Sequence, residues 1–468
     1  MPLTFADIAA ATHGRLIGGN EAEDVDGISI DSRAVVAGDL FVAIRGDRFD
    51  GHRFLADAFA RGARGAVIEA SGAASGSGAV EGGAQAFICV EDTTRALQDM
   101  AREVRRRSGA KVVAITGSAG KTTTKEVTAE LLATRHSVYR NKGNLNNHIG
   151  LPLSLLELRS RPEVAVVELG MNHAGEIRAL VGIAEPEVRV WTNVGDAHMG
   201  FFASADAIAD AKAEILEQAR ATDVLVANAD DARIVSRMKR FAGRVVTFGM
   251  DEAADVRATS VVVRGLEGTS ARVDTPAGGF DLETRLLGLG NLSNVLAATA
   301  VALQFDVPLE AIASTAATLR PARRRGELLR LPGGLTLIDD SYNSSPSALR
   351  RALETLEAAT GSARKIAVLG EMLELGAHAT ALHEQSGAAA ARSGLDLLVT
   401  IGGAPAEAMA AAAVAGGMPA AAVVHVASSA EAAEVTLARA RPGDLVLVKA
   451  SRGIGADLVV DRLTAEFA

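Results

Sequence analysis

The chain has 468 residues, a net charge of −9 and only 3% aromatic residues. This length predicts about three domains, and the lack of a basic segment with interleaved aromatic residues argues against a nucleic-acid partner. The single cysteine, Cys89, leaves no internal disulfide and is typical of a reducing compartment. Residues 1–7 lack the basic start and apolar run of a signal peptide, and glycines and a proline interrupt the most apolar tract, residues 406–424. We therefore expect a cytoplasmic protein without membrane insertion.

The first unit, residues 1–106, contains the segment Asp31-Ser32-Arg33 ahead of a predicted strand at residues 40–44. Serine and arginine together can hold a pyrophosphate, because the guanidinium offers a planar fork of donors. A surface turn with a helix cap explains the segment equally well. Residues 71–83 are rich in glycine, alanine and serine and indicate a surface loop. Residues 105–107, three arginines, indicate a solvated helix end.

The central unit, residues 107–320, begins with a β-branched run at 111–115 that is typical of a buried parallel strand. T-G-S-A-G-K-T-T-T follows at residues 116–124, and then a predicted amphipathic helix at 125–133. This is the layout of a phosphate-binding loop, in a short form because isoleucine stands where the first glycine is expected. Lys121 would reach the terminal phosphates and Thr122 would hold magnesium.

Backbone amides of this loop and the helix N-terminus would face the phosphate oxygens. The predicted phosphate-contacting residues are Thr116, Gly117, Ser118, Ala119, Gly120, Lys121, Thr122 and Thr123.

Strands and helices then alternate, which implies a mostly parallel sheet with helices on both faces. The predicted strands are residues 163–169, 189–194, 225–228 and 245–248. Residues 255–286 predict a small antiparallel patch, and residues 291–305 a helix.

After a predicted linker at residues 320–326, the third unit (321–468) alternates again as a second doubly wound layer. Its predicted strands are residues 335–338, 365–369, 397–401, 423–426 and 445–448. The predicted class is α/β, with three domains.

Ligands in open α/β sheets bind at the carboxyl ends of the strands. Glu168 lies there in V-A-V-V-E-L, where a buried carboxylate needs a partner, and magnesium is a natural one. His198 follows the next strand and is a candidate ligand beside Lys121 and Glu168, although alone it is more typical of a loop. Lys212 has the pattern of an exposed helical lysine.

Two further segments are denser in polar residues than capping requires. Asn144, Asn146 and Asn147 precede an apolar helix, and capping explains only one of them. In the third unit, residues 339–343 (D-D-S-Y-N) close a strand with two acids, ahead of Pro346, which can open the next helix.

Taken together, these segments resemble the Mur ligase family of peptidoglycan synthesis over nearly the whole chain. D-S-R, G-D-L-F-V-A and D-G-H-x-F are similar to the family's UDP-binding domain, and G-S-A-G-K-T-T-T-K is similar to its ATP loop. Four segments are similar to the branch that adds D-alanyl-D-alanine to UDP-N-acetylmuramoyl-tripeptide. They are N-L-N-N-x-I-G-x-P, E-L-G-M-N-H-x-G-E-I, D-D-S-Y-N-x-x-P and L-G-E-M-L-E-L-G with His383.

The resemblance implies an ATP-dependent ligase that works through an acyl phosphate, with ATP and magnesium as cofactors. It implies an N-terminal domain for the UDP-linked substrate, a central ATP-binding domain and a C-terminal Rossmann-like domain for the dipeptide. The expected partners are these small molecules, and the expected state is a monomer.

The resemblance also implies residue roles. The reaction would use Lys121, Lys212, His198 and Asn147. Magnesium would be bound by Thr122, Glu168, His198 and a carbamylated Lys212. The nucleotide would be held by Asn291, Asn294, Arg325 and Asp340. The other substrates would contact Ser32, Arg33, Asn146, Asn147, Tyr342 and Asn343.

Two positions depart from the family's pattern. Gly290 stands where the family often has a histidine before Asn291 and Asn294, so a histidine contribution to nucleotide binding is absent. Ala450 replaces the glycine of K-G-S-R, and alanine there can shift the loop that helps hold the dipeptide.

Three alternatives share the expected fold. One is a sibling ligase that adds a single amino acid by the same chemistry. That sibling usually has an alanine-histidine-threonine-proline segment where this chain has Y-N-S-S-P at residues 342–346. A folate polyglutamate ligase is disfavoured by the D-S-R domain. A non-catalytic ATP-dependent scaffold is disfavoured because Lys121, Glu168, His198 and Lys212 are all present.

Overall fold

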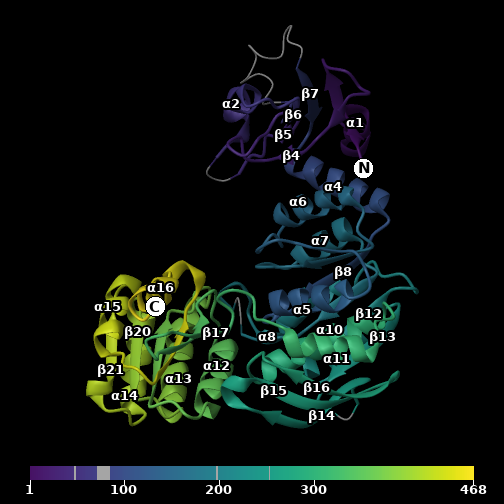
Figure 1. The fold of residues 1–468 in the computed structure, drawn as a ribbon. Helices are drawn as coiled ribbons and strands as arrows, with labels where there is room; N and C mark the ends of the chain where they lie inside the picture. The colour runs from purple at the N-terminus through teal and green to yellow at the C-terminus, as the bar shows by residue number, and fades with distance from the viewer. Residues whose placement is uncertain (47–48, 71–84, 197–198, 252) are drawn as a thin grey trace. The chain divides into compact units, whose positions relative to one another are not determined.

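The computed structural model describes residues 1–46, 49–70, 85–196, 199–251 and 253–468 (Figure 1). The predicted loop at residues 71–83 and the candidate ligand His198 lie outside these residues. The described chain forms two compact units. The first comprises Met1–Ala114, His136–Met171 and Glu176–Glu187, and the second comprises Ile115–Arg135, Asn172–Gly175 and Val188–Ala468.

The first unit opens with a five-stranded sheet in the order β2-β7-β6-β5-β4. All its neighbouring strands are parallel except β2 and β7. Phe41 and Ile68 of the sheet pack with Leu55 of α2 in a small core. The elements are β1 (Leu3–Thr4), α1 (Phe5–Thr12), β2 (Arg15–Ile17), β3 (Asp24–Val25), β4 (Ile28–Ser29), β5 (Leu40–Val42), α2 (Leu55–Ala60), β6 (Gly65–Glu69), β7 (Ala86–Val90) and α4 (Thr93–Ser108). The predicted strand at residues 40–44 is therefore confirmed as β5.

The end of α4 is not a solvated arginine cluster, so that prediction was wrong for Arg105. Its side chain is buried, and its guanidinium donates to the carbonyls of Ala184 (2.8 Å) and Glu185 (2.7 Å). It also pairs with Glu187 at 2.7 Å. The physical reason is the last turn of α7 (Glu176–Ala184), whose carbonyls need donors outside the helix.

The first unit also contains β9 (Val138–Arg140), α6 (Gly150–Leu156) and β10 (Val164–Glu168). Strand β10 is buried along its whole length and pairs parallel with β9, which confirms the strand predicted at residues 163–169. Strand β8 (Lys111–Thr116) starts in the first unit and ends in the second. Its side chains are buried from Val112 onward, as the β-branched run predicts.

The central part of the second unit is a sheet whose strands β11, β12, β13 and β14 are parallel. Strands β14, β15 and β16 are antiparallel and confirm the predicted patch. The elements are α5 (Lys121–Ala133), β11 (Val188–Trp191), α8 (Ala205–Ala213), β12 (Val224–Asn228), α9 (Ala232–Met238), β13 (Arg244–Gly249), β14 (Val256–Val263), β15 (Thr269–Thr275), β16 (Gly278–Thr284), α10 (Gly288–Leu303) and α11 (Leu309–Thr318). Trp191, the only tryptophan of the chain, is fully buried at the end of β11.

The C-terminal part of the second unit is a six-stranded sheet in the order β17-β18-β22-β19-β20-β21, parallel except for β17. The strands are β17 (Glu327–Arg330), β18 (Thr336–Asp340), β19 (Arg364–Gly370), β20 (Leu397–Ile401), β21 (Val423–Val426) and β22 (Asp444–Lys449). The helices are α12 (Pro346–Ala358), α13 (Ala379–Arg392), α14 (Ala404–Ala415), α15 (Ser429–Arg439) and α16 (Asp457–Glu466). All five predicted strands are present, and Pro346 begins α12 as predicted.

Successive side chains of these strands serve two separate cores, because side chains alternate between the faces of a strand. Leu445 and Leu447 pack with apolar residues of α12, α13 and α14. Val446 and Val448 pack with α15 and α16 on the opposite face (Figure 1). This arrangement confirms the predicted doubly wound layer.

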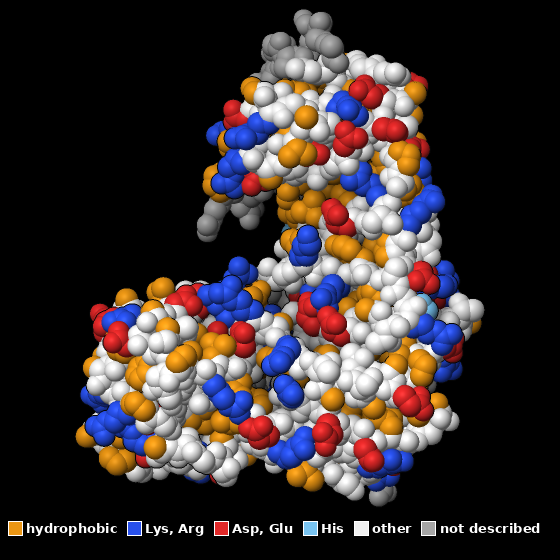
Figure 2. All heavy atoms as spheres, viewed as in Figure 1, with side chains coloured by type: hydrophobic (Ala, Val, Ile, Leu, Met, Phe, Trp, Pro, Cys, Tyr) orange, Lys and Arg blue, Asp and Glu red, His pale blue; other side chains and the backbone are white. Residues whose placement is uncertain are grey.

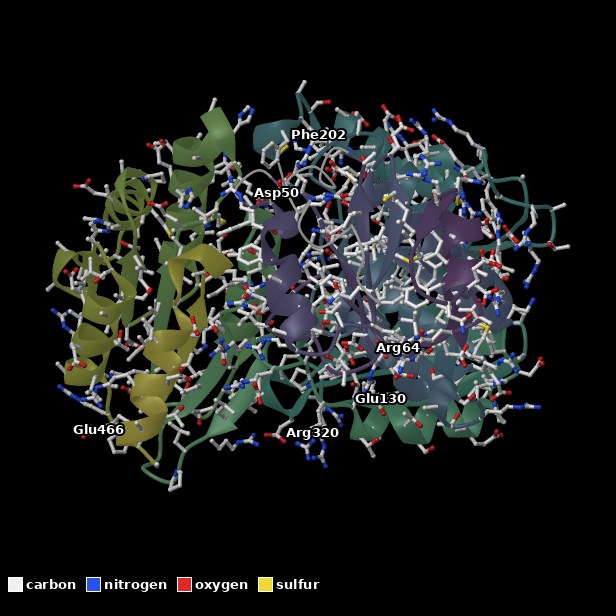
Figure 3. All side chains as sticks on the ribbon, turned by 90° about the horizontal axis from the view of Figure 1, so that it is seen from above. Asp50, Arg64, Glu130, Phe202, Arg320 and Glu466 are labelled. Atoms are coloured by element: carbon white, nitrogen blue, oxygen red, sulfur yellow. The ribbon has the colours of Figure 1, made fainter. Side chains whose placement is uncertain are left out.

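The predicted linker at residues 320–326 is exposed at its start, where the Arg320 side chain points outward (Figure 3). Basic and acidic side chains are interspersed on the face drawn in Figure 2. Within the described residues, no helix combines the length and apolar character needed to cross a bilayer. The tract at residues 406–424 forms most of α14, a short turn and the start of β21.

Candidate active site

The phosphate loop between β8 and α5 requires glycine at two positions. Gly117 and Gly120 have φ angles of +155° and +81°. A Cβ on Gly117 would lie 1.9 Å from Thr192 Oγ1, and a Cβ on Gly120 would lie 2.3 Å from Asn294 Oδ1. Any side chain would therefore collide with the residues that support the loop.

Asn193, which the sequence prediction missed, holds the middle of this loop. Its Oδ1 accepts from the Ala119 N–H at 2.9 Å, and its Nδ2 donates to the Ala119 carbonyl at 3.0 Å. The Ser118 N–H donates to the Asn193 carbonyl at 3.1 Å. The amides of Ser118 and Ala119 are thus directed to residue 193. The one available signal was a polar residue directly after a buried strand.

The N-terminus of α5 supplies the remaining amides. Its first helical bond runs from the Thr124 N–H to the Gly120 carbonyl at 2.8 Å. The amides that precede this bond face outward from the helix start, where the helix dipole favours an anion. This geometry supports phosphate binding by the backbone around Lys121.

Two lysines converge on the start of the loop. Lys121 Nζ and Lys212 Nζ both donate to the Gly117 carbonyl, at 2.9 and 3.2 Å. Lys212 lies in α8 and is only 1% exposed, so the interpretation of an exposed helical lysine was wrong. Burial, and then the charge of Lys121, lower the pKa of Lys212 well below its ordinary value. This lowering favours the neutral, nucleophilic amine more than in an ordinary lysine.

Asn291 and Asn294 form a short chain of hydrogen bonds toward the phosphate loop. Asn294 Nδ2 donates to Asn291 Oδ1 at 3.2 Å, and Asn294 Oδ1 accepts from Thr124 Oγ1 at 3.2 Å. Asn291 Nδ2 donates to the Leu287 carbonyl at 2.9 Å. The buried Asn294 thus supports Gly120 and Thr124 from α10.

In the C-terminal part of this unit, Asp340 and Tyr342 are surrounded by basic side chains. Lys449, nearly buried, donates to Asp340 Oδ2 at 2.6 Å and to the Asn343 carbonyl at 3.0 Å. The guanidinium carbons of Arg325 and Arg452 lie 4.1 and 5.5 Å from the Tyr342 ring centroid. The sequence prediction named neither Lys449 nor Arg452 as a site residue.

The segment after Lys449 stays tied to its neighbours despite alanine at position 450. Ala450 packs directly on Gly370, where an added Cβ would lie 2.5 Å from the Ala450 Cβ. The Ser451 N–H donates to the Glu371 carbonyl at 3.1 Å, and Ser451 Oγ accepts from the Leu373 N–H at 2.9 Å.

His383 of α13 fixes the loop at residues 371–373, to which Ser451 is also bonded. Its ring is fully buried, and Nε2 accepts from the Met372 N–H at 2.9 Å. Nδ1 therefore carries the proton and donates to the Ala379 carbonyl at 2.7 Å. Burial lowers the pKa of His383, so the ring is neutral in the folded protein.

In the first unit, Glu168 is 2% exposed at the end of β10. Asn146 Nδ2 donates to Glu168 Oε1 at 2.5 Å, and the Glu168 N–H donates to Asn141 Oδ1 at 3.3 Å. Asn147 Oδ1 accepts from the N–H of Gly150, the first residue of α6, at 2.8 Å. Asn147 is therefore the asparagine of this segment that bonds the start of the following helix.

Asp31, Ser32 and Arg33 form a compact turn in the first unit. Arg33 is exposed and pairs with Asp31 at 2.8 Å, whereas Ser32 is buried. The hydrogen bond from the Arg33 side chain lowers the pKa of Asp31 to about 2. The surface-turn interpretation describes this geometry, and pyrophosphate binding by Ser32 and Arg33 stays a prediction.

Among the residues that the structure describes, no three His, Cys, Asp or Glu side chains are grouped as metal ligands. A magnesium site would therefore need hydroxyl or carbamate oxygens as well as carboxylates. Thr122 and Lys212 belong to the second unit and Glu168 to the first.

Three family models match the chain in succession. They are the Mur ligase family catalytic domain at residues 24–105, the Mur ligase middle domain at residues 115–302 and the glutamate ligase domain at residues 324–452. The chain belongs to the Mur ligase family, and its fold is the α/β, three-domain architecture of that family.

Within the family, curated relatives that share one enzyme name match the chain over nearly its full length. It is 32% identical to the UDP-N-acetylmuramoyl-tripeptide–D-alanyl-D-alanine ligase of Bacillus subtilis (strain 168), covering 98% of both chains. It is 36% identical to the enzyme of that name from Treponema pallidum (strain Nichols), covering 100% of both.

Solved structures give the same result as the sequence comparisons. A MurF structure from Acinetobacter baumannii has a TM-score of 0.88 at 30% identity and covers 99% of both chains. The MurF ligase of Thermotoga maritima in complex with ADP has a TM-score of 0.82 at 29% identity, covering 94% of this chain and 97% of that one.

Replacing Gly120 with alanine tests the phosphate loop. We expect Gly120→Ala to weaken binding of a non-hydrolysable ATP analogue by at least about tenfold, because a left-handed alanine costs roughly 1–2 kcal/mol and its Cβ would overlap Asn294 Oδ1. Isothermal titration calorimetry measures the affinity.

Gly361→Ala is the matched control. Gly361 has a φ of +83°, but nothing lies within 4 Å of its would-be Cβ, so its replacement adds backbone strain away from the loop. Equal affinities for both variants and the unaltered chain would contradict the loop's role.

The buried neutral His383 predicts a pH dependence of stability. Since burial lowers the pKa of His383 in the folded state, the unfolded chain takes up its proton first as the pH falls below about 6.5. The contribution of the neutral His383 ring to the free energy of unfolding is therefore complete above about pH 6.5, and it is lost as the pH falls toward the folded-state pKa. Between about pH 7.5 and 5.5, the free energy of unfolding of His383→Gln should therefore fall by less than that of the unaltered chain. The expected difference is of the order of 1 kcal/mol, measured by urea unfolding. The exposed His378, replaced by glutamine, should leave the slope unchanged. A His383→Gln slope equal to that of the unaltered chain would refute this.

Proposed function

We propose that this protein is an ATP-dependent ligase that joins D-alanyl-D-alanine to UDP-N-acetylmuramoyl-tripeptide in peptidoglycan precursor synthesis. The convergence of Lys121 and Lys212 on the Gly117 carbonyl of a phosphate loop carries the proposal. It stands in a chain that matches ligases of this name from end to end. The ADP complex of the Thermotoga maritima relative supports ATP as the nucleotide.

The reaction has to convert a poor acyl donor into a good one. The terminal carboxylate oxygen of the tripeptide attacks the γ-phosphorus of ATP, the bond to the bridging oxygen breaks, and ADP leaves. The amine of D-alanyl-D-alanine then attacks the acyl phosphate carbon and loses a proton. The tetrahedral intermediate collapses to the amide as phosphate leaves. Charge neutralisation and positioning are the main demands on the protein.

The phosphate loop meets the first demand. The Lys121 ammonium neutralises charge on the β- and γ-phosphates, while the backbone amides of residues 121–123 at the start of α5 orient them. Loop residues Gly117 and Gly120 allow the backbone to approach closely.

Lys212 is proposed to act as a carbamate. A neutral amine can attack CO₂ to form an N-carboxylate with release of one proton, and burial favours the neutral amine here. The product places an anion beside the Lys121 ammonium, where the buried Lys212 amine offers no favourable charge pair.

The oxygen donors fit magnesium, which prefers hydroxyl, carboxylate and carbamate oxygens to an amine. The residues that would hold it are Thr122, Glu168, His198 and carbamylated Lys212. Bound magnesium would neutralise phosphate charge during transfer.

The remaining assignments follow the family. Asn291, Asn294, Arg325 and Asp340 would hold the nucleotide, and Tyr342 and Asn343 would shape the dipeptide pocket. Ser32, Arg33, Asn146 and Asn147 would contact the UDP-linked substrate or the transferred phosphate. The proposed domains are residues 1–106, 107–320 and 321–468. The single cysteine supports a cytoplasmic location, and a monomer is proposed.

A substrate panel tests the function. The protein should release ADP from ATP only with UDP-N-acetylmuramoyl-tripeptide and D-alanyl-D-alanine together, and Lys121→Ala should abolish release while the UDP-linked substrate still binds. Use of a free diamino acid in place of the dipeptide would instead indicate the sibling ligase. Full turnover by Lys121→Ala would remove the loop from the mechanism.

Replacement of Lys212 tests the carbamate. Lys212→Ala should lose activity that short-chain carboxylates such as acetate partly restore, because an added carboxylate can take the carbamate's place. In the unaltered protein, ¹³C-bicarbonate should give a carbamate NMR signal that Lys212→Ala lacks. Full activity without added carboxylate would refute the role.

A further inference from the structure

The start of α10 and one face of α12 lie unusually close together. A Cβ on Gly288 would lie 2.8 Å from Thr355 Oγ1, and a Cβ on Gly290 would lie 3.2 Å from Arg351 Cδ and 3.5 Å from its Nε. Arg351 and Thr355 are four residues apart and share one face of α12. Gly290 therefore leaves the space that the Arg351 side chain occupies, and Gly288 leaves room for Thr355.

The Arg351 guanidinium finds no acceptor among the residues that the structure describes. Across residues 1–46, 49–70, 85–196, 199–251 and 253–468, its side chain makes neither a hydrogen bond nor an ion pair. It is only partly exposed, and burial lowers the pKa of Arg351. A partly buried guanidinium whose donors are unused is costly, so the arrangement favours a ligand at this point.

The neighbours of Arg351 are the residues proposed for the nucleotide. Gly290 directly precedes Asn291, and the charge of Asp340 acts on the Arg351 guanidinium. The other charged groups that influence it are Glu354 and Arg350 of its own helix. Arginine suits a purine because its planar guanidinium stacks on aromatic rings and donates to ring nitrogens.

We propose that Arg351 contacts the adenine ring of bound ATP, from the place that opens because position 290 is glycine. The proposal rests on the proposed ATP site at Asn291 and Asp340. It makes Arg351 a binding residue for the base and not for the phosphates.

Two ligands distinguish a contact with the adenine base from a contact with the phosphates, in binding experiments that need no ligase turnover. We expect Arg351→Ala to weaken a non-hydrolysable ATP analogue about tenfold, as expected for a lost desolvated cation–π contact. Inorganic tripolyphosphate, which has no base, should bind both forms equally. The affinity of Arg351→Lys for the analogue should lie between those of Arg351→Ala and the unaltered protein, since lysine keeps the charge but lacks the planar guanidinium. The exposed neighbour Arg350, replaced by alanine, should change neither affinity.

Each contrary result has a distinct meaning. Unchanged analogue affinity in both Arg351→Ala and Arg351→Lys would overturn the proposal, and so would an equal loss for tripolyphosphate. Failure of the unaltered protein to bind the analogue would overturn the ATP site and the role of Arg351 together. If Arg351→Ala does not fold, which circular dichroism shows, Arg351→Lys and Arg351→Gln give the same comparison.

Discussion

Two lysine side chains share one acceptor at the head of the phosphate loop, and the rest of the site depends on this arrangement. Lys121 and Lys212 both donate to the carbonyl of Gly117. Two ammonium groups so close together, one of them shielded from water, repel strongly at the low effective dielectric of an interior. Burial and the Lys121 charge lower the pKa of Lys212, which favours its amine form. The pair thus gives one cation suited to phosphate and one nucleophile suited to carbon dioxide.

Rigid support is the second condition for this arrangement. Gly117 and Gly120 let the loop backbone approach Thr192 and Asn294 closely. Asn193 bonds the N–H and the carbonyl of Ala119, and Asn294 of α10 accepts a hydrogen bond from Thr124. A corresponding network lies at the carboxyl ends of β18 and β22, where Lys449 joins Asp340 to the Asn343 carbonyl. Asn193 follows β11, and Asp340 and Lys449 end β18 and β22, so these side chains lie at the carboxyl ends of parallel strands. Open α/β sheets bind ligands at such ends.

The strands, the helices and the glycine loop between β8 and α5 could be predicted because local patterns determine them, whereas phosphate binding by that loop stays a prediction. Hydrophobic periodicity located the buried strands, and glycine spacing located the loop. Burial of polar side chains could not be predicted in this way. Lys212 lies in a pattern typical of an exposed helix, and only the packing of α8 buries it. Arg105 similarly looks like a solvated helix end, yet the carbonyls at the end of α7 surround its guanidinium. The places of Asn193 and Lys449 likewise depend on which strands become neighbours.

The lone tryptophan has a practical consequence. Trp191 is fully buried at the end of β11, two residues before Asn193. Indole emission shifts to shorter wavelength in apolar surroundings, and no second indole in the chain adds to the signal. Intrinsic fluorescence of the unlabelled protein therefore reports on one location, the buried end of β11 next to Thr192 and Asn193. Changes there can be followed in real time without attaching a dye.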